Sequence, residues 1–333
     1  MRDEILKYLD QNGKVKTGEL VKFFGKDRTT IYRWLKKLEN EGSVIQIKKG
    51  TYKLKEKIEK YFNIPVWERK KIKYNPEFLK NYIPNETYFF SKQNLEKLEN
   101  TIKDLPIDTD FYKTNKRLLE TLMIDLSFAS SYLEGNTYSY LDTEVLLKYN
   151  EISKEKTSEE TQMILNHKKA IEYMIYYKKE LNFNKQTFFE IHSFLGNKLL
   201  LKEELGIIRN KIVEIGGSTY KPLDNQFQLE EEFEIFLEKL NKIKNPFEQS
   251  LFIMVFIPYF QLFLDINKRT SRIMGNLPLI KYNLPVLSLI QLEKKKYIVA
   301  ILAIYELNDT SLIQKLWIDN YLLNLERYKN YLN

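Results

Sequence analysis

Apolar residues recur every three or four positions through the N-terminal part of the chain. This spacing predicts three short helices, each followed by a glycine that can end it: Gly13, Gly25 and Gly42. Thr17 and Asp27 stand where the second and third helices begin, and we expect each to cap its helix. Residues 43–54 then alternate between apolar and polar side chains, which predicts two short strands.

Helical spacing also dominates the larger C-terminal part of the chain. It predicts helices over these ranges: 117–135, 143–151, 157–181, 185–200, 248–263, 269–283, 294–307 and 311–329. Strand-like alternation over 208–220 predicts a small β-hairpin. Residues 56–110 contain four prolines and many aromatic side chains, and we interpret them as a connector arm that packs on the next domain. The pattern therefore predicts a mainly α-helical protein in three parts, 1–55, 56–110 and 111–333.

Composition narrows the class of protein without assigning a function. The 333 residues are 43% apolar, enough for a sizeable core, and include no cysteine, which excludes disulfides and thiolate metal sites. The N-terminus lacks the apolar segment of a signal peptide. The longest apolar run, 251–264, contains Pro258 and is too short to span a bilayer. We expect a soluble, cytoplasmic protein with no membrane partner.

Positive charge is concentrated in the first domain. Residues 1–55 contain 14 Lys or Arg and 7 Asp or Glu, so they hold +7 of the chain's net +8. Three helices and two strands in this order resemble a winged helix-turn-helix domain, whose third helix enters the major groove of DNA. We expect DNA contacts from the third helix and the turn between the strands: Arg28, Thr29, Thr30, Tyr32, Arg33, Lys36, Lys48 and Lys49. The alternative is a protein-binding winged helix with a solvated basic face.

The segment QLFLDINKRTSR, residues 261–272, follows the most apolar helix and carries the strongest chemical signal. A helix that begins here offers unpaired backbone N–H groups and the positive end of its dipole to an anion. Arg269 and Arg272 lie three residues apart, so both project from one face of that helix and can bind successive phosphates. Asp265 is a candidate ligand for a magnesium ion that bridges phosphates. Lys268 adds a further cation.

The same segment resembles the signature of the Fic family, which transfers AMP onto protein hydroxyls and has the pattern His-x-Phe-x-Asp-Gly-Asn-x-Arg-x-x-Arg. The match rests on five residues: Phe263, Asp265, Asn267, Arg269 and Arg272. The resemblance implies a Fic-type helical domain that binds ATP or a related nucleotide, with magnesium, through Asp265, Asn267, Lys268, Arg269 and Arg272. It departs at two positions, because Gln261 replaces the histidine and Ile266 replaces the glycine.

Two other segments extend the resemblance. SSYLEGN, residues 130–136, resembles the family's inhibitory helix motif, which implies that Glu134 pairs with Arg272 and closes the γ-phosphate subsite. Without the resemblance, a glutamate before a glycine at a helix end would be a solvated capping residue. GIIRNKIVEIGGSTYKP, residues 206–222, resembles the family's flap, a strand pair that holds an extended protein target by backbone hydrogen bonds. The expected target contacts are Gly216, Gly217, Ser218 and Thr219.

The two departures bear on catalysis. In the family the histidine accepts the proton of the target hydroxyl, and the amide of Gln261 has no basic nitrogen to do so. Ile266 is β-branched and resists a positive φ, so either this loop has an ordinary conformation or the phosphates sit differently. The chain has two histidines, His167 and His192. We interpret both as hydrogen-bonded packing residues on helices, with His192 the better candidate for a replacement base.

Three functions are compatible with these residues. The first is a DNA-binding, homodimeric regulator whose catalytically impaired Fic domain binds a nucleotide. The second is a slow or altered AMP transferase (a protein adenylyltransferase) that Glu134 holds off. The third is a scaffold that uses the fold to bind a partner protein, and the intact arginine pair argues against it. We favour the first, and the sequence leaves open the nucleotide, the operator DNA, any protein target and residual transfer.

Overall fold

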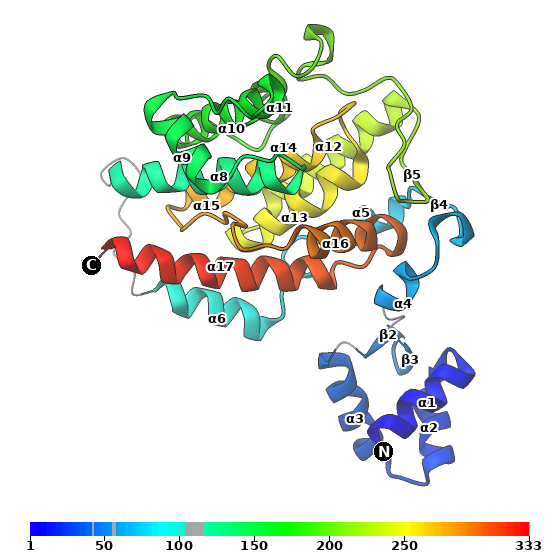
Figure 1. Ribbon diagram of the computed structural model, residues 1–333. Coiled ribbons are helices and arrows are strands. Elements are labelled where there is room, and N and C mark those ends of the chain that lie inside the picture. Colours follow the sequence, from blue (N-terminus) through cyan, green and yellow to red (C-terminus); the bar gives the residue numbers. More distant parts are fainter. Residues whose placement is uncertain (42, 55–57, 104–115, 333) are drawn as a thin grey trace. The chain divides into compact units, whose positions relative to one another are not determined.

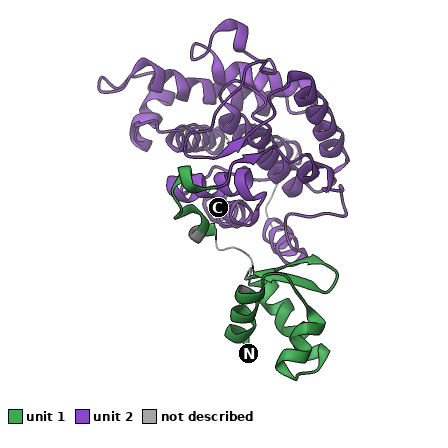
Figure 2. Cartoon of the chain, turned by 90° about the vertical axis from the view of Figure 1, so that its right-hand side faces the viewer, with its two compact units in different colours: residues 1–69 green, residues 70–333 purple. Residues whose placement is uncertain are grey.

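The computed structural model describes residues 1–41, 43–54, 58–103 and 116–332. The chain forms two compact units, residues 1–69 and 70–333, which have different colours in Figure 2. The connector arm predicted over 56–110 is therefore divided between the units. Both ends predicted for that arm, and Gly42, the expected end of the third helix, lie outside the described residues.

The first unit consists of helices and a three-stranded antiparallel sheet (Figure 1). Its elements are α1 (Arg2–Asn12), β1 (Val15–Lys16), α2 (Thr17–Phe24), α3 (Arg28–Asn40), β2 (Val44–Lys48), β3 (Thr51–Leu54), α4 (Ile58–Phe62) and a 3-10 turn (Val66–Glu68). The strand order is β1-β3-β2, and β2 and β3 are the two strands predicted from alternation. The core is formed by these buried side chains: Ile5, Leu9, Val15, Leu20, Ile31, Leu35, Leu38, Val44 and Tyr52.

The two predicted helix caps in this unit have different outcomes. Asp27 caps α3 as expected, because its Oδ1 accepts a hydrogen bond from Thr30 N at 2.8 Å. The cap predicted at Thr17 is wrong, since α2 begins at Thr17 itself and the preceding Lys16 makes no side-chain cap bond. The Thr17 hydroxyl instead donates to the Gly50 carbonyl at 3.0 Å. The physical reason is that β1 pairs with β3 and brings the turn between β2 and β3 next to the start of α2.

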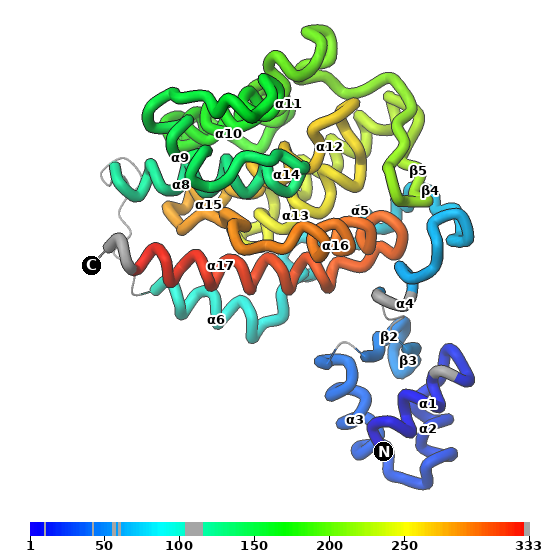
Figure 3. The backbone as a smooth tube through the Cα atoms, viewed as in Figure 1, coloured from blue at the N-terminus to red at the C-terminus, as the bar shows by residue number. Residues whose placement is uncertain are grey.

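The second unit is mainly α-helical, as the periodicity predicts (Figures 1 and 3). Its elements are β4 (Ile72–Lys73), α5 (Pro76–Lys80), α6 (Lys92–Ile102), α8 (Lys116–Leu133), α9 (Tyr140–Tyr149), α10 (Ser158–Tyr176), α11 (Lys185–Gly196), a 3-10 turn (Lys202–Glu204), β5 (Tyr220–Lys221), α12 (Gln226–Lys242), α13 (Pro246–Phe260), α14 (Asn267–Met274), α15 (Leu277–Lys281), α16 (Lys294–Leu307) and α17 (Ser311–Leu332). α13 lies at the centre and packs against α12, α14, α15 and α16. Among the described residues, no helix combines the length and the apolar character that a membrane crossing needs.

α13 is almost entirely buried, and local chemistry defines both of its ends. Asn245 Oδ1 accepts hydrogen bonds from Phe247 N at 2.9 Å and Glu248 N at 3.3 Å. Pro246 occupies the first helical position, where a missing N–H leaves no bond unmade. All later residues of the helix are buried. At its end Gln261 adopts the left-handed conformation, which turns the chain into the loop before α14.

The segment that carries α5 and α6 packs on this core. The buried carboxylate of Glu248 accepts hydrogen bonds from Phe89 N at 3.0 Å and Phe90 N at 2.8 Å. The Phe90 ring packs against Trp317, which is fully buried and donates from Nε1 to Ser250 Oγ at 3.0 Å. A buried acceptor and a buried aromatic contact therefore fix this segment to the helices.

The hairpin expected over 208–220 does not form. Residues 208–219 contain no strand, and the flap ends in β5, which pairs in parallel with β4. Ile72 N donates to Thr219 O at 3.2 Å in this pairing. The pairing is confined to Tyr220 and Lys221, and their partner comes from a distant part of the sequence, which periodicity alone cannot identify.

Candidate anion-binding site and candidate DNA interface

The loop between α13 and α14 contains two residues with left-handed backbone conformation, Gln261 with φ 50° and Ile266 with φ 64°. Ile266 therefore keeps the positive φ that a glycine would adopt easily, and the alternative of an ordinary loop conformation is wrong. This conformation costs a residue with a Cβ about 1–2 kcal/mol. The Ile266 side chain is only 2% exposed, and its burial in the core offsets that cost.

Asn267 closes the same loop with its side chain. Phe263 N donates to Asn267 Oδ1 at 2.8 Å, and Asn267 Nδ2 donates to Phe263 O at 2.8 Å. Both ends of this buried amide therefore bind backbone. The residue that the resemblance assigns to nucleotide binding thus shapes the loop and the start of α14 in this structure.

Arg272 projects from α14 into the core and is 3% exposed. Its Nε donates to Ser130 Oγ at 3.0 Å and its Nη2 to the Ser130 carbonyl at 2.9 Å. Its Nη1 donates to Glu134 Oε1 at 2.8 Å and to Tyr297 OH at 2.9 Å. The guanidinium also lies 5.3 Å from the centroid of the Tyr297 ring. Arg272 is therefore bound to the end of α8 and to α16.

Glu134 follows α8 and pairs with two cations of α14. Its Oε1 accepts from Arg272, and its Oε2 lies 2.9 Å from Lys268 Nζ. Burial raises the pKa of this carboxyl group, but Arg272 and Lys268 together outweigh burial and lower the pKa of Glu134 to about 2. The carboxylate is therefore ionised at neutral pH. The pairing of Glu134 with Arg272 that the resemblance implies is present.

Arg269 lies three residues earlier on the same helix in a different environment. Its side chain is 10% exposed, and among the described residues its guanidinium has one polar contact, from Nη2 to Asp265 Oδ2 at 3.5 Å. Burial lowers the pKa of Arg269, and the nearby carboxylates of Asp265 and Glu134 offset this effect only in part. Arg269 therefore offers hydrogen-bond donors that the described residues leave largely unused.

These groups surround a small cavity of about 40 Å³. Its lining consists of Glu134, Gln261, Asp265, Ile266, Asn267, Lys268 and Arg269. Pockets for drug-sized ligands have volumes of roughly 300–1,000 Å³. The cavity therefore suits a phosphate-sized group better than a whole nucleotide, and Glu134 forms the wall whose displacement would enlarge it.

The Gln261 side chain is held at the edge of this cavity by both ends of its amide. Nε2 donates to the Pro258 carbonyl at 2.7 Å and to Tyr305 OH at 3.0 Å. Oε1 accepts from Asn267 Nδ2 at 3.4 Å. Because an amide has no basic nitrogen, this residue cannot take a proton from a hydroxyl.

The two histidines are buried and hydrogen-bonded, in agreement with their interpretation as packing residues. His167 contacts Ser130 Oγ through Nε2 at 2.9 Å, and burial lowers the pKa of His167 to about 3. His192 Nδ1 accepts from Gly206 N at 3.0 Å, so Nε2 carries the proton and donates to the Asp265 carbonyl at 3.3 Å. Burial likewise lowers the pKa of His192 to about 4. His192 therefore binds the backbone of the loop at Asp265, and neither of its ring nitrogens has a lone pair directed into the cavity.

Arg209 holds the backbone next to the site in place, and it was not predicted from the sequence. It is 4% exposed and binds backbone carbonyls: Nε donates to Gln261 O at 2.5 Å, Nη1 to Lys211 O at 2.8 Å, and Nη2 to Leu223 O. Burial lowers the pKa of this guanidinium. Arg209 thereby ties both ends of the flap to the end of α13. The available signal was an arginine directly after two isoleucines, an unusual place for a solvated charge.

The predicted target contacts lie in the flap before β5. Gly216 and Gly217 are exposed, and Gly217 has φ 75°. Ser218 Oγ donates to Glu306 Oε1 at 2.8 Å, and Thr219 N donates to the same oxygen at 3.2 Å. Glu306 of α16 therefore fixes the last part of the flap and leaves the two glycines at the surface.

The predicted DNA contacts fall into two groups. The exposed ones are Arg28, Thr29, Tyr32 and Arg33 on α3, and Lys48 and Lys49 at the turn between β2 and β3. The Thr30 hydroxyl donates to Asp27 Oδ2 at 2.6 Å, and Lys36 pairs with Glu39 at 2.7 Å. Thr30 and Lys36 are therefore already bound to neighbouring side chains at α3. The exposed residues form the candidate interface with DNA.

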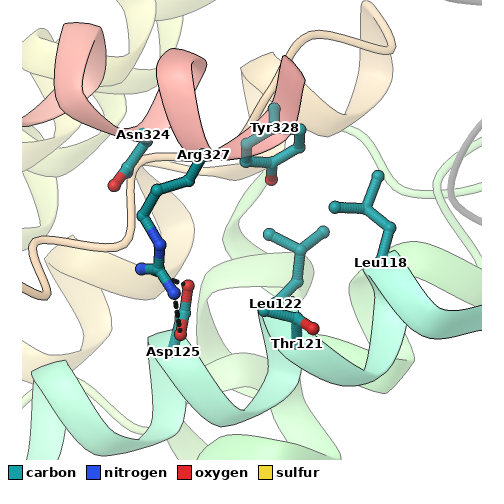
Figure 4. Close-up of a pocket in the computed structure, with 7 residues that line it drawn as sticks. All are labelled: Leu118, Thr121, Leu122, Asp125, Asn324, Arg327 and Tyr328. Atoms are coloured by element: carbon teal, nitrogen blue, oxygen red, sulfur yellow. Dashed lines mark hydrogen bonds and ion pairs between the residues drawn. The ribbon is translucent and has the colours of Figure 1, made fainter. Parts of the chain in front are cut away.

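A second, smaller cavity lies between α8 and α17 (Figure 4). Arg327 pairs there with Asp125 at 2.8 Å, as the dashed lines show. Burial raises the pKa of Asp125 and Arg327 lowers it, with burial the stronger. Tyr140 OH also donates to Asp125, at 2.9 Å. Because its charged groups bind each other, we assign this cavity a role in joining the helices.

The fold and the site define a protein with a helical domain whose small, charged cavity lies at a helix N-terminus, on a chain that also carries a helix-turn-helix unit. Residues 182–279 match the model of the Fic/DOC family, and residues 2–57 match that of a DeoR-like helix-turn-helix domain. The chain therefore carries a Fic/DOC-type domain and a DeoR-like helix-turn-helix domain, which confirms both resemblances.

Solved structures of Fic proteins share this fold. A fragment of Fic-1 from C. elegans has a TM-score of 0.57 at 19% identity, over 72% of this chain and 70% of that one. A Fic domain containing signalling protein from Bacteroides thetaiotaomicron has 0.57 at 18%, over 71% and 97%. A Fic family protein from Desulfovibrio desulfuricans has 0.59 at 15%, over 75% and 77%. At these identities the likeness establishes the fold alone. No curated protein sequence matches the chain.

Proposed function

We propose that this protein is a DNA-binding regulator whose Fic-type domain binds the phosphates of an ATP-like nucleotide and transfers little from it. The observation that carries this proposal is the contrast between Arg269 and Gln261. Arg269 is a buried cation whose one ion-pair partner among the described residues is the largely exposed Asp265, 3.5 Å away, and it lines a cavity beside a helix N-terminus. Gln261 stands beside that cavity without a basic nitrogen. The site can therefore attract a phosphate but lacks the base for transfer.

The phosphate donors would be Arg269, Lys268 and the first backbone N–H groups of α14. Lys268 now pairs with Glu134 at 2.9 Å and would exchange that carboxylate for a phosphate. Arg272 already binds protein acceptors and would act mainly through its charge. Binding of a full triphosphate therefore requires Glu134 to move.

Asp265 is the candidate magnesium ligand. Its side chain is 65% exposed. The described residues contain no group of three or more His, Cys, Asp or Glu side chains that could hold a metal. Because Mg²⁺ takes one or two carboxylates and completes its shell with phosphate oxygens and water, it would arrive with the nucleotide and neutralise phosphate charge.

Isothermal titration with Mg-ATP, Mg-ADP and pyrophosphate tests nucleotide binding. Glu134→Gly should tighten ATP binding because it removes the wall of the cavity, and Arg269→Ala should weaken binding of all three anions by about tenfold to a hundredfold. Lys296→Ala, which breaks an exposed ion pair on α16, is the matched control and should change nothing. Absence of binding in Glu134→Gly at millimolar ATP would overturn the proposal.

The helix-turn-helix unit supports the DNA-binding half of the proposal. Such domains read paired half-sites as dimers, so we propose a homodimer. A gel shift with duplex DNA from upstream of the protein's own coding sequence, with and without ATP, tests both halves together. Binding that ATP leaves unchanged would mean that the nucleotide does not regulate the DNA contact.

A second candidate is a slow protein AMP transferase, and the Glu134–Arg272 ion pair favours it because that contact narrows the cavity in the way the inhibitory motif implies. Labelled ATP distinguishes the two. Under the regulator proposal Glu134→Gly stays unlabelled, whereas Glu134→Gly/Gln261→His gains a base worth roughly 10²–10⁴-fold in rate. Labelling by Glu134→Gly alone, lost again when Arg269→Ala is added, would replace the regulator with the transferase.

A further inference from the structure

Lys294, the first residue of α16, lies against the chain segment that carries Glu134. A Cβ atom at Gly135 would stand 3.1 Å from Lys294 Nζ, so the ammonium group lies beside the residue that follows Glu134. Tyr297 lies three residues later, on the same face of α16, and its hydroxyl accepts a hydrogen bond from Arg272 Nη1 at 2.9 Å. This face of α16 therefore meets the ion pair of Glu134 with Arg272.

Lys294 differs from the two lysines that follow it. It is half-buried, and among the described residues none forms a hydrogen bond or an ion pair with its side chain. Lys295 is exposed, and Lys296 pairs with Glu293 at 3.0 Å. The first turn of α16 contains no acidic residue, and the positive end of a helix dipole disfavours cations. Its own helix therefore does not explain the position of the Lys294 charge.

The carboxylate of Glu134 is fully used by two other cations. Its Oε1 accepts from Arg272 at 2.8 Å, and its Oε2 lies 2.9 Å from Lys268 Nζ. A carboxylate has no third oxygen for Lys294, whereas a terminal phosphate offers three oxygens and about two negative charges. The flexible four-carbon stem of lysine lets the ammonium group adjust to such an anion. A terminal phosphate that replaces this carboxylate can therefore face three cations instead of two.

We propose that Lys294 binds the terminal phosphate of a nucleoside triphosphate after Glu134 has moved, and that it makes the site prefer a triphosphate to a diphosphate. The inference rests on the proposed function, because it requires a nucleotide whose inner phosphates lie at Arg269 and the start of α14. A diphosphate ends before Lys294, so only the triphosphate gains this contact. Lys294 does not line the cavity while Glu134 is in place, and it joins the site when that wall is displaced.

Isothermal titration of the full chain with Mg-ATP and Mg-ADP is the test. In the Glu134→Gly background, Lys294→Ala should weaken Mg-ATP binding by roughly tenfold and leave Mg-ADP binding unchanged, because only the triphosphate loses a charged hydrogen bond. Lys295→Ala is the matched control, since it removes the same charge from the adjacent, exposed position and should change neither affinity. Lys294→Gln replaces Lys294→Ala if the alanine variant loses its helical circular dichroism.

Several results would overturn the inference alone. An equal loss for both nucleotides, or the same loss in Lys295→Ala, would indicate general attraction by charge. A loss that occurs in the presence of Glu134 and disappears in Glu134→Gly would mean that Lys294 binds the displaced carboxylate. Unchanged Mg-ATP affinity with a lower unfolding free energy would make Lys294 a residue that stabilises the end of α8. If Glu134→Gly binds neither nucleotide, the proposed function fails and the inference fails with it.

Discussion

The two arginines of α14 lie three residues apart on one helix, yet their surroundings are opposite. Arg272 donates to Ser130, Glu134 and Tyr297 and is saturated by them. Arg269 is almost as buried but, within the part of the chain that the structure describes, has one long contact, with Asp265. The difference arises from their neighbours, because Arg272 meets α8 and α16 whereas Arg269 meets the cavity and a loop. One arginine of the motif therefore joins three parts of the fold, and the other lines the cavity where we propose that an anion binds.

The largest expected effect comes from Arg272→Ala. Removing one partner of a buried ion pair typically costs about 3–5 kcal/mol of unfolding free energy, and here Ser130 and Glu134 both lose a donor. Urea unfolding followed by circular dichroism measures the loss, with Arg272→Lys as the milder control. A loss of unfolding free energy below about 1 kcal/mol would place Arg272 in the range of surface ion pairs and contradict its role in holding the fold together.

Low pH should also destabilise the fold through the ion pair of Glu134 with Arg272. The pKa of Glu134 is lowered from 4.5 to about 2 in the folded chain, so its ionised form contributes fully above pH 4.5. That contribution, about 3 kcal/mol from the size of the shift, is lost progressively as pH falls from 4.5 through 2. Urea unfolding of the wild type and Glu134→Gln at several pH values in this window gives the slope difference. If the unfolding free energies of the two proteins change in parallel with pH, the Glu134–Arg272 pair contributes nothing to stability.

Arg269→Ala should have the reverse profile, with little change in stability and a clear loss of binding. A hydrogen bond to a charged group contributes roughly 1.5–3 kcal/mol, so phosphate affinity should fall about tenfold to a hundredfold. Titration with pyrophosphate measures this, and urea unfolding of the same sample serves as the control. If Arg269→Ala destabilises the fold as much as Arg272→Ala does, the two arginines have the same role.

The smallest effect extends the comparison to the first unit, where Arg33 is exposed on α3. If it contacts a DNA phosphate, Arg33→Ala should reduce the slope of log affinity against log salt by about 0.9. Lys7→Ala, an exposed cation on α1, is the control and should leave the slope unchanged. Equal slopes for Arg33→Ala and the wild type would remove Arg33 from the interface.

Several features could be predicted from the sequence because residues within one helical turn decide them. Asp27 binds a backbone N–H three residues away, which its position already indicates. β2 and β3 are joined by a short turn, so alternation was sufficient to find them. The mainly helical fold followed from periodicity in the same way.

Other features depend on contacts between distant residues. Thr17 binds Gly50 and Arg209 binds Gln261, and neither partner can be read from local spacing. The flap pairs with β4, and Asn267 turns inward to the backbone. α12 was not among the predicted helices, although its buried residues have helical spacing: Leu229, Phe233, Phe236, Leu237 and Leu240.

The burial of Trp317 has a spectroscopic consequence. The chain has three tryptophans, and the other two, Trp34 and Trp67, belong to the first unit, where Trp67 is 81% exposed. Emission from Trp317 should be blue-shifted and that from Trp67 red-shifted, so loss of the blue component during denaturation reports on the second unit. Trp34 lies on α3, and its quenching by DNA would report on the first. Intrinsic fluorescence can therefore follow the two units separately without a label.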